Sequence, residues 1–317
     1  KATDIIVYKA SSASQAVMFR MRYNITLNKC ELDTLNVNAP YNAITKENLT
    51  SLLNQVNSYS NTGYYSILVG CHGSGWTPRG SDSTMPRASR AFGGQGSELQ
   101  YDLSDLSYAI ANSAMKKVEF VSFDDCYMAN VETAYELRDV TNYLVASTSE
   151  VMGDGFPYDT LFKYMLGTPD YDNICQSFYN FYIKNSSPYG TLAAIRCGDA
   201  IKQMAKVMKA INSTYTFDQS KLNDVQYLDG YHVHVFYDLR AYYDQLDVLP
   251  PLSANFKTAL DNLVPYKVYT PYIYTNLYNN HDTIKVYTFS GITISDPTKN
   301  TYLQDSKKNT AWWQATH

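Results

Sequence analysis

Two side chains with catalytic potential stand where predicted buried strands end. His72 follows the apolar segment 64–71, and Cys126 follows the apolar segment 118–123. Each segment is a run of β-branched and aromatic residues that stops at polar or glycine residues, as a strand does when it enters a loop. In an open α/β sheet, side chains at the carboxyl ends of the strands face the crevice where ligands bind. The sequence therefore predicts an imidazole and a thiol in one cleft, an arrangement suited to nucleophilic catalysis.

The surroundings of Cys126 act on its thiol in opposite directions. A thiol is a weak nucleophile until it ionises, and a helix predicted to begin near Tyr127 favours the thiolate through its dipole. Asp124 and Asp125 oppose ionisation. Asp124 lies on the same face of the strand as Cys126, where a carboxylate lining the adjoining pocket would select a positively charged substrate side chain. The alternative is that both aspartates cap the helix and that Cys126 is a buried thiol.

His72 precedes a glycine-rich turn that contains Gly73 and Gly75. Glycine leaves the backbone uncovered, so amide N–H groups in this turn can approach a substrate closely. The amides of Gly73 and Cys126 are therefore candidates for an oxyanion hole. The alternative is a strand-end histidine packed under Trp76.

The composition is that of a globular protein. The chain has 317 residues, of which 45% are hydrophobic and 18% charged, enough to bury a sizeable core. The net charge of −4 gives no reason to expect nucleic acid or an anionic membrane as a partner. No apolar run approaches the roughly 18 residues of a membrane span. The chain begins Lys1-Ala2-Thr3-Asp4, and we expect that any export signal has been removed or left out.

Neither a disulfide framework nor a metal site is predicted. The cysteines are odd in number and widely spaced, without paired C-x-x-C motifs. His232 and His234 alternate along a predicted strand, but no third ligand is evident. The five cysteines are Cys30, Cys71, Cys126, Cys175 and Cys197.

The predicted elements alternate between apolar strands and amphipathic helices, which indicates an α/β fold with a mainly parallel central sheet and helices on both faces. Strands are predicted at 4–8, 64–71, 118–123, 143–148, 191–196, 233–238 and 286–294. One helix is capped by Thr45 and a second ends at Lys116-Lys117. The third is the helix that follows Cys126, and the fourth has the apolar face Ile201, Met204, Met208 and Ile211.

Two breaks in this pattern suggest how the chain is organised. Leu249-Pro250-Pro251 is a predicted boundary between a catalytic domain, residues 1–250, and a small C-terminal subdomain, residues 251–317. Residues 77–100 have no hydrophobic period and are dense in Gly, Ser, Pro and Arg. A loop of this length in a compact domain is usually functional or disordered.

The segments 71–76 (Cys-His-Gly-Ser-Gly-Trp) and 124–126 (Asp-Asp-Cys) resemble the catalytic motifs of the clostripain-like cysteine peptidases, relatives of caspases, legumains and gingipains. Segments 153–158, 237–239 and 310–313 also fit, so the resemblance covers roughly residues 45–317. The N-terminal part fits less well, which indicates either a missing region or divergence. The resemblance implies a caspase-like three-layer α/β sandwich.

The resemblance also implies roles for individual residues. Cys126 corresponds to the nucleophile and His72 to the general acid/base of a Cys–His dyad. Asp124 matches the acidic specificity position, and Asp154 a second one, which implies cleavage after Arg or Lys. A carboxylate that holds a guanidinium gains a charge-assisted bond, in agreement with the interpretation of Asp124 from the residues alone. The alternative for Asp154 is a turn residue between two glycines.

The resemblance suggests activation by proteolysis. Family members are often made as zymogens and cut between the His and the Cys. We therefore expect autocleavage in the 77–100 loop, at Arg87 or Arg90 rather than at Arg79, which is tethered too close to His72. An alternative is a flexible surface loop with solvated arginines.

The expected protein is a monomeric, secreted, periplasmic or cell-surface endopeptidase that acts on proteins or peptides with basic residues. It requires no cofactor, and calcium, on which some relatives depend, is not indicated by an EF-hand motif. Two alternatives remain at this stage. One is a caspase-like peptidase or transpeptidase of other specificity, and the other is a non-catalytic binding protein on a caspase-like scaffold.

Overall fold

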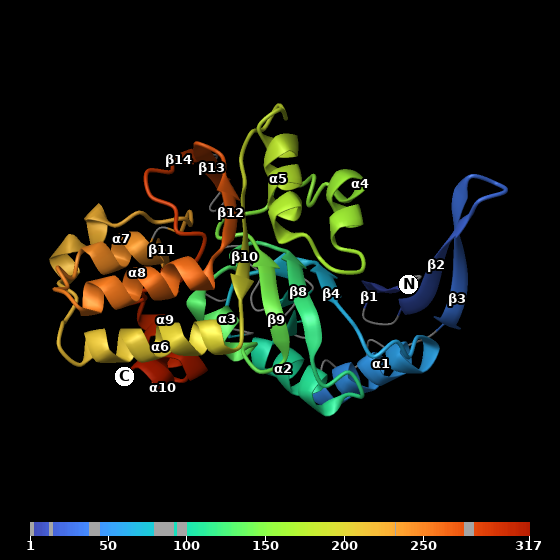
Figure 1. The fold of residues 1–317 in the computed structure, drawn as a ribbon, viewed down its shortest axis with the longest axis horizontal. Coiled ribbons are helices and arrows are strands. Elements are labelled where there is room, and N and C mark those ends of the chain that lie inside the picture. Colours follow the sequence, from blue (N-terminus) through green and yellow to red (C-terminus); the bar gives the residue numbers. More distant parts are fainter. Residues whose placement is uncertain are drawn as a thin grey trace.

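The fold is seen in a computed structural model (Figure 1), which describes residues 3–12, 15–37, 45–78, 92–93, 100–231, 233–275 and 282–317. At its centre is a five-stranded sheet with the strand order β12-β10-β9-β8-β4. Its strands are β4 (Ile67–Gly70), β8 (Val118–Asp124), β9 (Thr141–Ala146), β10 (Thr191–Arg196) and β12 (Tyr266–Tyr269).

The central sheet is mixed. β8 pairs in parallel with both β4 and β9, whereas β10 pairs antiparallel with β9 and with β12. The predicted α/β class is confirmed. The parallel half contains the ends of the two strands that precede His72 and Cys126.

Helices cover both faces of the sheet, and the alternation of side chains along each strand explains why. Along β8, Val121 and Phe123 pack into one hydrophobic cluster and Phe120 packs into another. Onto the first face pack α1 (Lys46–Tyr59), α2 (Leu103–Asn112), α3 (Val131–Glu136), α6 (Asp199–Asn212) and α8 (Leu252–Leu263). Onto the second pack α4 (Tyr158–Leu161), the 3-10 turn η2 (Phe162–Tyr164) and α5 (Tyr171–Tyr182). The predicted three-layer arrangement is confirmed.

Local sequence signals located three of the helices correctly. The Thr45 hydroxyl accepts a hydrogen bond from the Asn48 amide at 3.2 Å and caps α1, as predicted. α6 carries the predicted apolar face, and α2 lies where the second helix was predicted, although it ends at Asn112 and not at the two lysines.

The helix expected directly after Cys126 was placed too early. α3 begins at Val131, after the cap residue Asn130, whose side chain accepts from the Thr133 amide at 2.7 Å. Cys126 is therefore not at a helix N-terminus, and the predicted dipole stabilisation of its thiolate was wrong.

A three-stranded antiparallel sheet formed by the N-terminal residues lies to one side of the central sheet (right in Figure 1). It consists of β1 (Ile5–Ser12), β2 (Gln15–Asn24) and β3 (Lys29–Val37). Only the first strand was predicted. β2 buries only Ala16 and Met18, and no side chain of residues 29–36 in β3 is buried. Strands that bury so few side chains give a weak signal in the sequence.

The C-terminal part joins the same core. β12 extends the central sheet, and Trp312 packs in the hydrophobic cluster that includes Leu144 of β9. The predicted strand 286–294 is largely wrong, because the strand there is β15 (Thr293–Ser295), paired with β11 (Phe236–Asp238). A boundary near Pro251 stays a prediction. The other elements are η3 (Gln219–Asp224), α7 (Leu239–Asp244), β13 (Tyr272–Thr275), β14 (Asp282–Lys285), α9 (Thr301–Lys308) and α10 (Ala311–Thr316).

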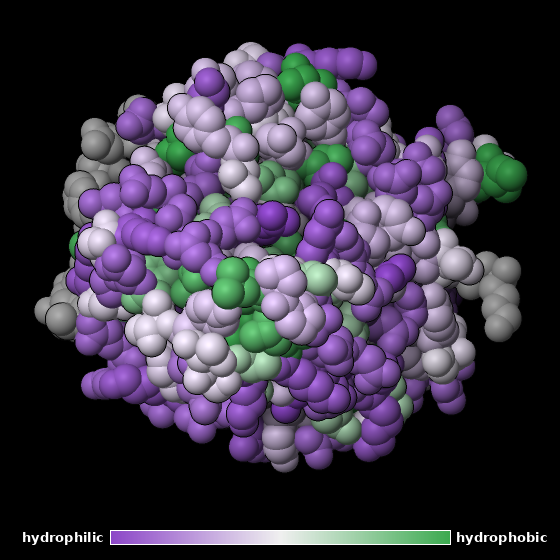
Figure 2. Space-filling view, turned by 60° about the vertical axis from the view of Figure 1, so that its left-hand side comes forward, coloured by the Kyte–Doolittle hydropathy of each residue, from purple (hydrophilic) through white to green (hydrophobic). Residues whose placement is uncertain are grey.

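The surface shown in Figure 2 is largely hydrophilic, with hydrophobic residues gathered near its middle. Among the described residues, none of the helices combines the length and the apolar character needed to cross a bilayer.

Candidate active site

The register of the central sheet brings His72 and Cys126 to the same edge. Gly70 of β4 is the partner of Asp124 in the neighbouring parallel strand β8. His72 and Cys126 each lie two residues beyond this pair, past the carboxyl ends of adjacent strands. In an open α/β sheet this edge is where ligands bind.

Gly73 lies directly against the Cys126 segment. A Cβ atom added to Gly73 would lie 2.6 Å from Cβ of Asp125 and 2.8 Å from the Cys126 carbonyl oxygen. Only a residue without a side chain allows this approach. His72 and Gly73 form the short strand β5 (His72–Gly73), which pairs with β6 (Phe92–Gly93), and β6 pairs with β7 (Gln100–Tyr101). His72 is exposed to solvent, and Cys126 is half-buried.

The thiol of Cys126 is held in its protonated form by its surroundings. Burial raises its pKa to about 12, and the negative charges of Glu150, Asp125 and Asp124 act in the same direction. The Val151 amide opposes the shift by donating a hydrogen bond to Sγ at 3.3 Å. A thiol in this state needs a base to take its proton before it attacks.

The residue after Cys126 adopts an unusual backbone conformation. Tyr127 has a φ of 61°, which is rare for a bulky side chain and is stable only where the surroundings impose it. Its ring stacks on Phe236 at 5.6 Å and its hydroxyl donates to Glu150 at 2.8 Å. Its amide donates to the Ser149 carbonyl at 3.1 Å. These contacts fix the turn that presents Cys126 and explain why the chain does not enter a helix there.

Asp124 lies beside the 153–158 segment. The Phe156 amide donates to both of its carboxylate oxygens at 3.1 Å, and the Tyr158 hydroxyl is a further hydrogen-bond partner. Burial raises the pKa of Asp124, and these two donors counteract the rise. Gly155, with a φ of 64°, permits the contact, since a Cβ there would lie 3.0 Å from an Asp124 oxygen. Asp124 does not cap a helix.

Asp154 belongs to the same segment but points elsewhere. Asp154 is exposed, and its carboxylate accepts a hydrogen bond from the Asn185 side chain at 2.9 Å. Asp124 and Asp154 nevertheless share a neighbour. Burial raises the pKa of Tyr182, and the charges of Asp124 and then Asp154 raise it further. The two carboxylates thus act on the same region.

Of the other predicted residues, four are not described by the structure and His234 makes contacts of its own. The expected cleavage positions Arg79, Arg87 and Arg90 fall outside the described residues, as does His232. His234 stacks on Tyr227 at 3.6 Å and contacts the Asp229 carboxylate at 3.1 Å. Across the described part of the chain, no group of three His, Cys, Asp or Glu side chains is arranged to hold a metal ion.

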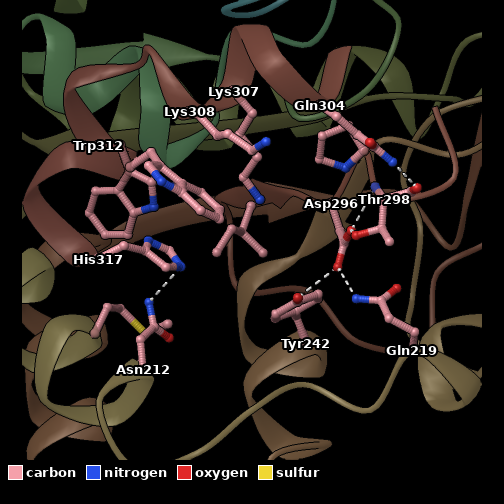
Figure 3. A pocket seen from close by; sticks show the side chains of 14 residues that line it. Asn212, Gln219, Tyr242, Asp296, Thr298, Gln304, Lys307, Lys308, Trp312 and His317 are labelled. Atoms are coloured by element: carbon pink, nitrogen blue, oxygen red, sulfur yellow. Dashed lines mark hydrogen bonds between the residues drawn. The ribbon is translucent and has the colours of Figure 1, made fainter. Parts of the chain in front are cut away.

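A pocket of about 340 Å³ lies elsewhere, between α6, the segment after β15 and the C-terminal helices (Figure 3). In it, Asp296 accepts hydrogen bonds from Tyr242 at 2.7 Å and from Gln219 at 3.1 Å. On its other side His317 contacts Asn212 at 3.4 Å. None of the predicted site residues that the structure describes lines this pocket, and its polar groups tie the C-terminal helices to the core.

The site contains residues that sequence reasoning missed. Glu150 and Val151 contact the Cys126 turn from the loop after β9, and no motif marks them. Asp125 was expected to oppose ionisation of Cys126, with a helix cap as the alternative, but its contact with the other strand end was not predicted: its carboxylate accepts from the Cys71 amide at 2.6 Å. The signal that could have marked Asp125 as a site residue was its position in the sequence between Asp124 and Cys126.

Similar solved structures include two cysteine proteases from Bacteroides thetaiotaomicron. One is a secreted C11 cysteine protease, 40% identical over 100% of this chain and 89% of its own, with a TM-score of 0.91. The other is a clostripain in complex with the peptide inhibitor BTN-VLTK-AOMK, 43% identical over 71% of this chain and 99% of its own, with a TM-score of 0.68. An inactive zymogen C11 protease from Parabacteroides distasonis shares the fold at 22% identity, over 99% of this chain and 87% of its own (TM-score 0.84). No curated protein sequence matches the chain.

A family model described as the clostripain family matches residues 2–316. The chain therefore belongs to the clostripain family of cysteine peptidases. The predicted family is confirmed. The match is longer than the predicted range 45–317, because the N-terminal sheet is also part of it.

Proposed function

We propose that the protein is an endopeptidase that cleaves after Arg or Lys, with Cys126 as nucleophile and His72 as general acid/base. The observation that carries the proposal is the register of β4 and β8, in which Gly70 pairs with Asp124. Two residues further along each strand come an imidazole and a thiol, the two groups that such a dyad requires.

In the proposed reaction, Sγ of Cys126 forms a bond to the scissile carbonyl carbon while its proton passes to the His72 imidazole. The resulting oxyanion is stabilised by the amides of Gly73 and Cys126. The C–N bond then breaks, and His72 gives its proton to the leaving amine. Water attacks the thioester with His72 as base, which releases the carboxylate product and restores the thiol. This scheme agrees with a resting thiol that is protonated at neutral pH.

The proposed specificity rests on Asp124. A half-buried carboxylate whose backbone donor already fixes its orientation is prepared to receive a guanidinium or ammonium group. Asp154 adds negative charge from a more exposed position. The peptide of the inhibitor bound to the similar clostripain ends in lysine, which supports the same preference.

We further propose that the protein is secreted, acts as a monomer and needs no cofactor. A similar protease described as secreted supports export. We propose activation by a cut in the 77–100 loop, since one protein that shares the fold is described as an inactive zymogen. Arg87 and Arg90 stay the proposed positions.

The test is covalent labelling with a peptide acyloxymethyl ketone that ends in Arg or Lys, followed by mass spectrometry. We expect one adduct per chain, on Cys126, in the wild-type protein after processing of the loop. Cys126→Ala should give no adduct, and His72→Ala should react far more slowly. A Cys71 adduct, or equal labelling of the Cys126→Ala variant, would refute the proposed nucleophile.

A further inference from the structure

Asp125 lies between Asp124 and Cys126 in sequence, yet its side chain contacts the strand that carries His72. It is 2% exposed. Oδ1 accepts a hydrogen bond from the Cys71 amide at 2.6 Å, and Oδ2 lies 3.3 Å from the Cys71 thiol. On the other side of His72, Gly73 packs so closely against Cβ of Asp125 that a side chain at position 73 would not fit. Asp125 thus contacts both sequence neighbours of His72.

The backbone around His72 has limited support from the sheets. β4 ends at Gly70, and within the described part of the chain the two residues of β5 pair only with β6. Strands of two residues contribute few ladder hydrogen bonds. When it is ionised, the carboxylate of Asp125 adds a charge-assisted hydrogen bond at the residue immediately before His72, of the kind that is roughly twice as strong as a neutral one.

Activation of the nucleophile does not explain this carboxylate. A negative charge beside Cys126 raises the pKa of the thiol and so disfavours the thiolate. Burial raises the pKa of Asp125 itself to about 7, although the Cys71 amide and thiol counteract the rise. A group that is costly to bury and acts against thiolate formation requires another reason for its position.

We infer that Asp125 is a positioning residue, whose carboxylate fixes the backbone at Cys71 and thereby holds His72 within reach of Cys126. The inference rests on the proposed dyad. Beyond that dyad, Asp125 joins the ends of β4 and β8 while taking no part in the bond changes. Displacement of a catalytic group by about 1 Å costs on the order of 100-fold in rate.

The test compares Asp125→Leu with Asp125→Asn, measured as kcat and KM on a fluorogenic Arg peptide. Leucine has the same branching but no acceptor, whereas asparagine keeps an acceptor for the Cys71 amide. We expect Asp125→Leu to lower kcat by about 100-fold with KM nearly unchanged, as for a residue that acts only on the chemical step. Asp125→Asn should stay within about tenfold of wild type, because a neutral acceptor keeps a weaker hydrogen bond.

Thermal unfolding of each variant checks that the fold is intact, and Asp125→Ala replaces the leucine variant if that variant does not fold. Equal kcat values for the leucine and asparagine variants, or a loss confined to KM, would overturn the positioning role. An inactive wild-type protein would instead refute the proposed function. The two failures are thus distinguishable.

Discussion

At the scale of single residues, the site combines a protonated thiol with a carboxylate that is already oriented. Cys126 is surrounded by Glu150, Asp125 and Asp124, and these charges act with burial to raise the pKa of its thiol. Family motifs predicted Cys126, His72 and Asp124, because such motifs record residue types at fixed spacing. They did not predict Glu150, since a contact from a distant loop leaves no local pattern in the sequence.

The raised pKa of Cys126 predicts a pH dependence. Because the thiol of the folded protein is neutral well above pH 7, its thiolate fraction should rise about tenfold for each pH unit between 7 and 9. The rate of Cys126 alkylation by iodoacetamide should rise with it, without a plateau in this range. The adduct is quantified by mass spectrometry, with Cys126→Ala as the blank. A rate that is constant from pH 6 to 8 would show a preformed thiolate–imidazolium pair instead.

The two carboxylates near the 153–158 segment should differ in effect. Asp124→Asn should lower kcat/KM on an Arg peptide by at least about 30-fold, the equivalent of ~2 kcal/mol for a hydrogen bond to a charged group. Asp154→Asn, a matched change at an exposed residue, should cost only about threefold, since exposed charges interact weakly. Steady-state kinetics on one substrate give both values. A larger effect at Asp154 would reverse the assignment.

At the scale of elements, most of the strong apolar patterns were predictive, although the strand expected at 286–294 was largely wrong. α1 and α6 follow from caps and helical periodicity, and β10 was predicted with its observed bounds. The start of α3 was missed because Tyr127, held by Phe236 and Glu150, takes a left-handed conformation. This is a tertiary effect that propensity does not contain.

The C-terminal helix α10 should contribute strongly to stability through one side chain. Trp312 is 2% exposed and packs edge-on against Tyr135 of α3, with ring centroids 5.7 Å apart. Trp312→Ala should therefore lower the free energy of unfolding by about 3–5 kcal/mol, through lost burial and an unfilled cavity. Urea denaturation measures the change. Trp313→Ala, at a half-buried neighbour, is the control and should cost clearly less; equal losses would contradict the packing argument.

At the scale of the whole molecule, the proposed cleavage loop separates elements that are packed together. β4 precedes the 77–100 loop and β8 follows it, and the two strands are paired in parallel. Trp76, before the loop, donates a hydrogen bond from its indole to Ser295 of β15. The loop itself lies mostly outside the described residues, so its position relative to the site stays a prediction.

These contacts predict that the cut protein stays in one piece. After processing, both fragments should elute together from a size-exclusion column and separate only in denaturant, because the core is shared between them. Denaturing gels of the native peak give the answer, and the Cys126→Ala protein should remain a single uncut chain. Separate elution of the fragments would contradict the shared core, and a nicked Cys126→Ala chain would indicate another protease.

The Cys126–His72 dyad and its preference for basic residues are tested most directly by the turnover of fluorogenic peptides that end in Arg, Lys or Asp. The proteins compared are the wild type, Cys126→Ala and His72→Ala. We expect the wild type to cleave the Arg or Lys peptide and not the Asp peptide, and both variants to lose this activity. Cleavage after Asp would contradict the role of Asp124. Basic-peptide cleavage that survives in Cys126→Ala would contradict the dyad itself.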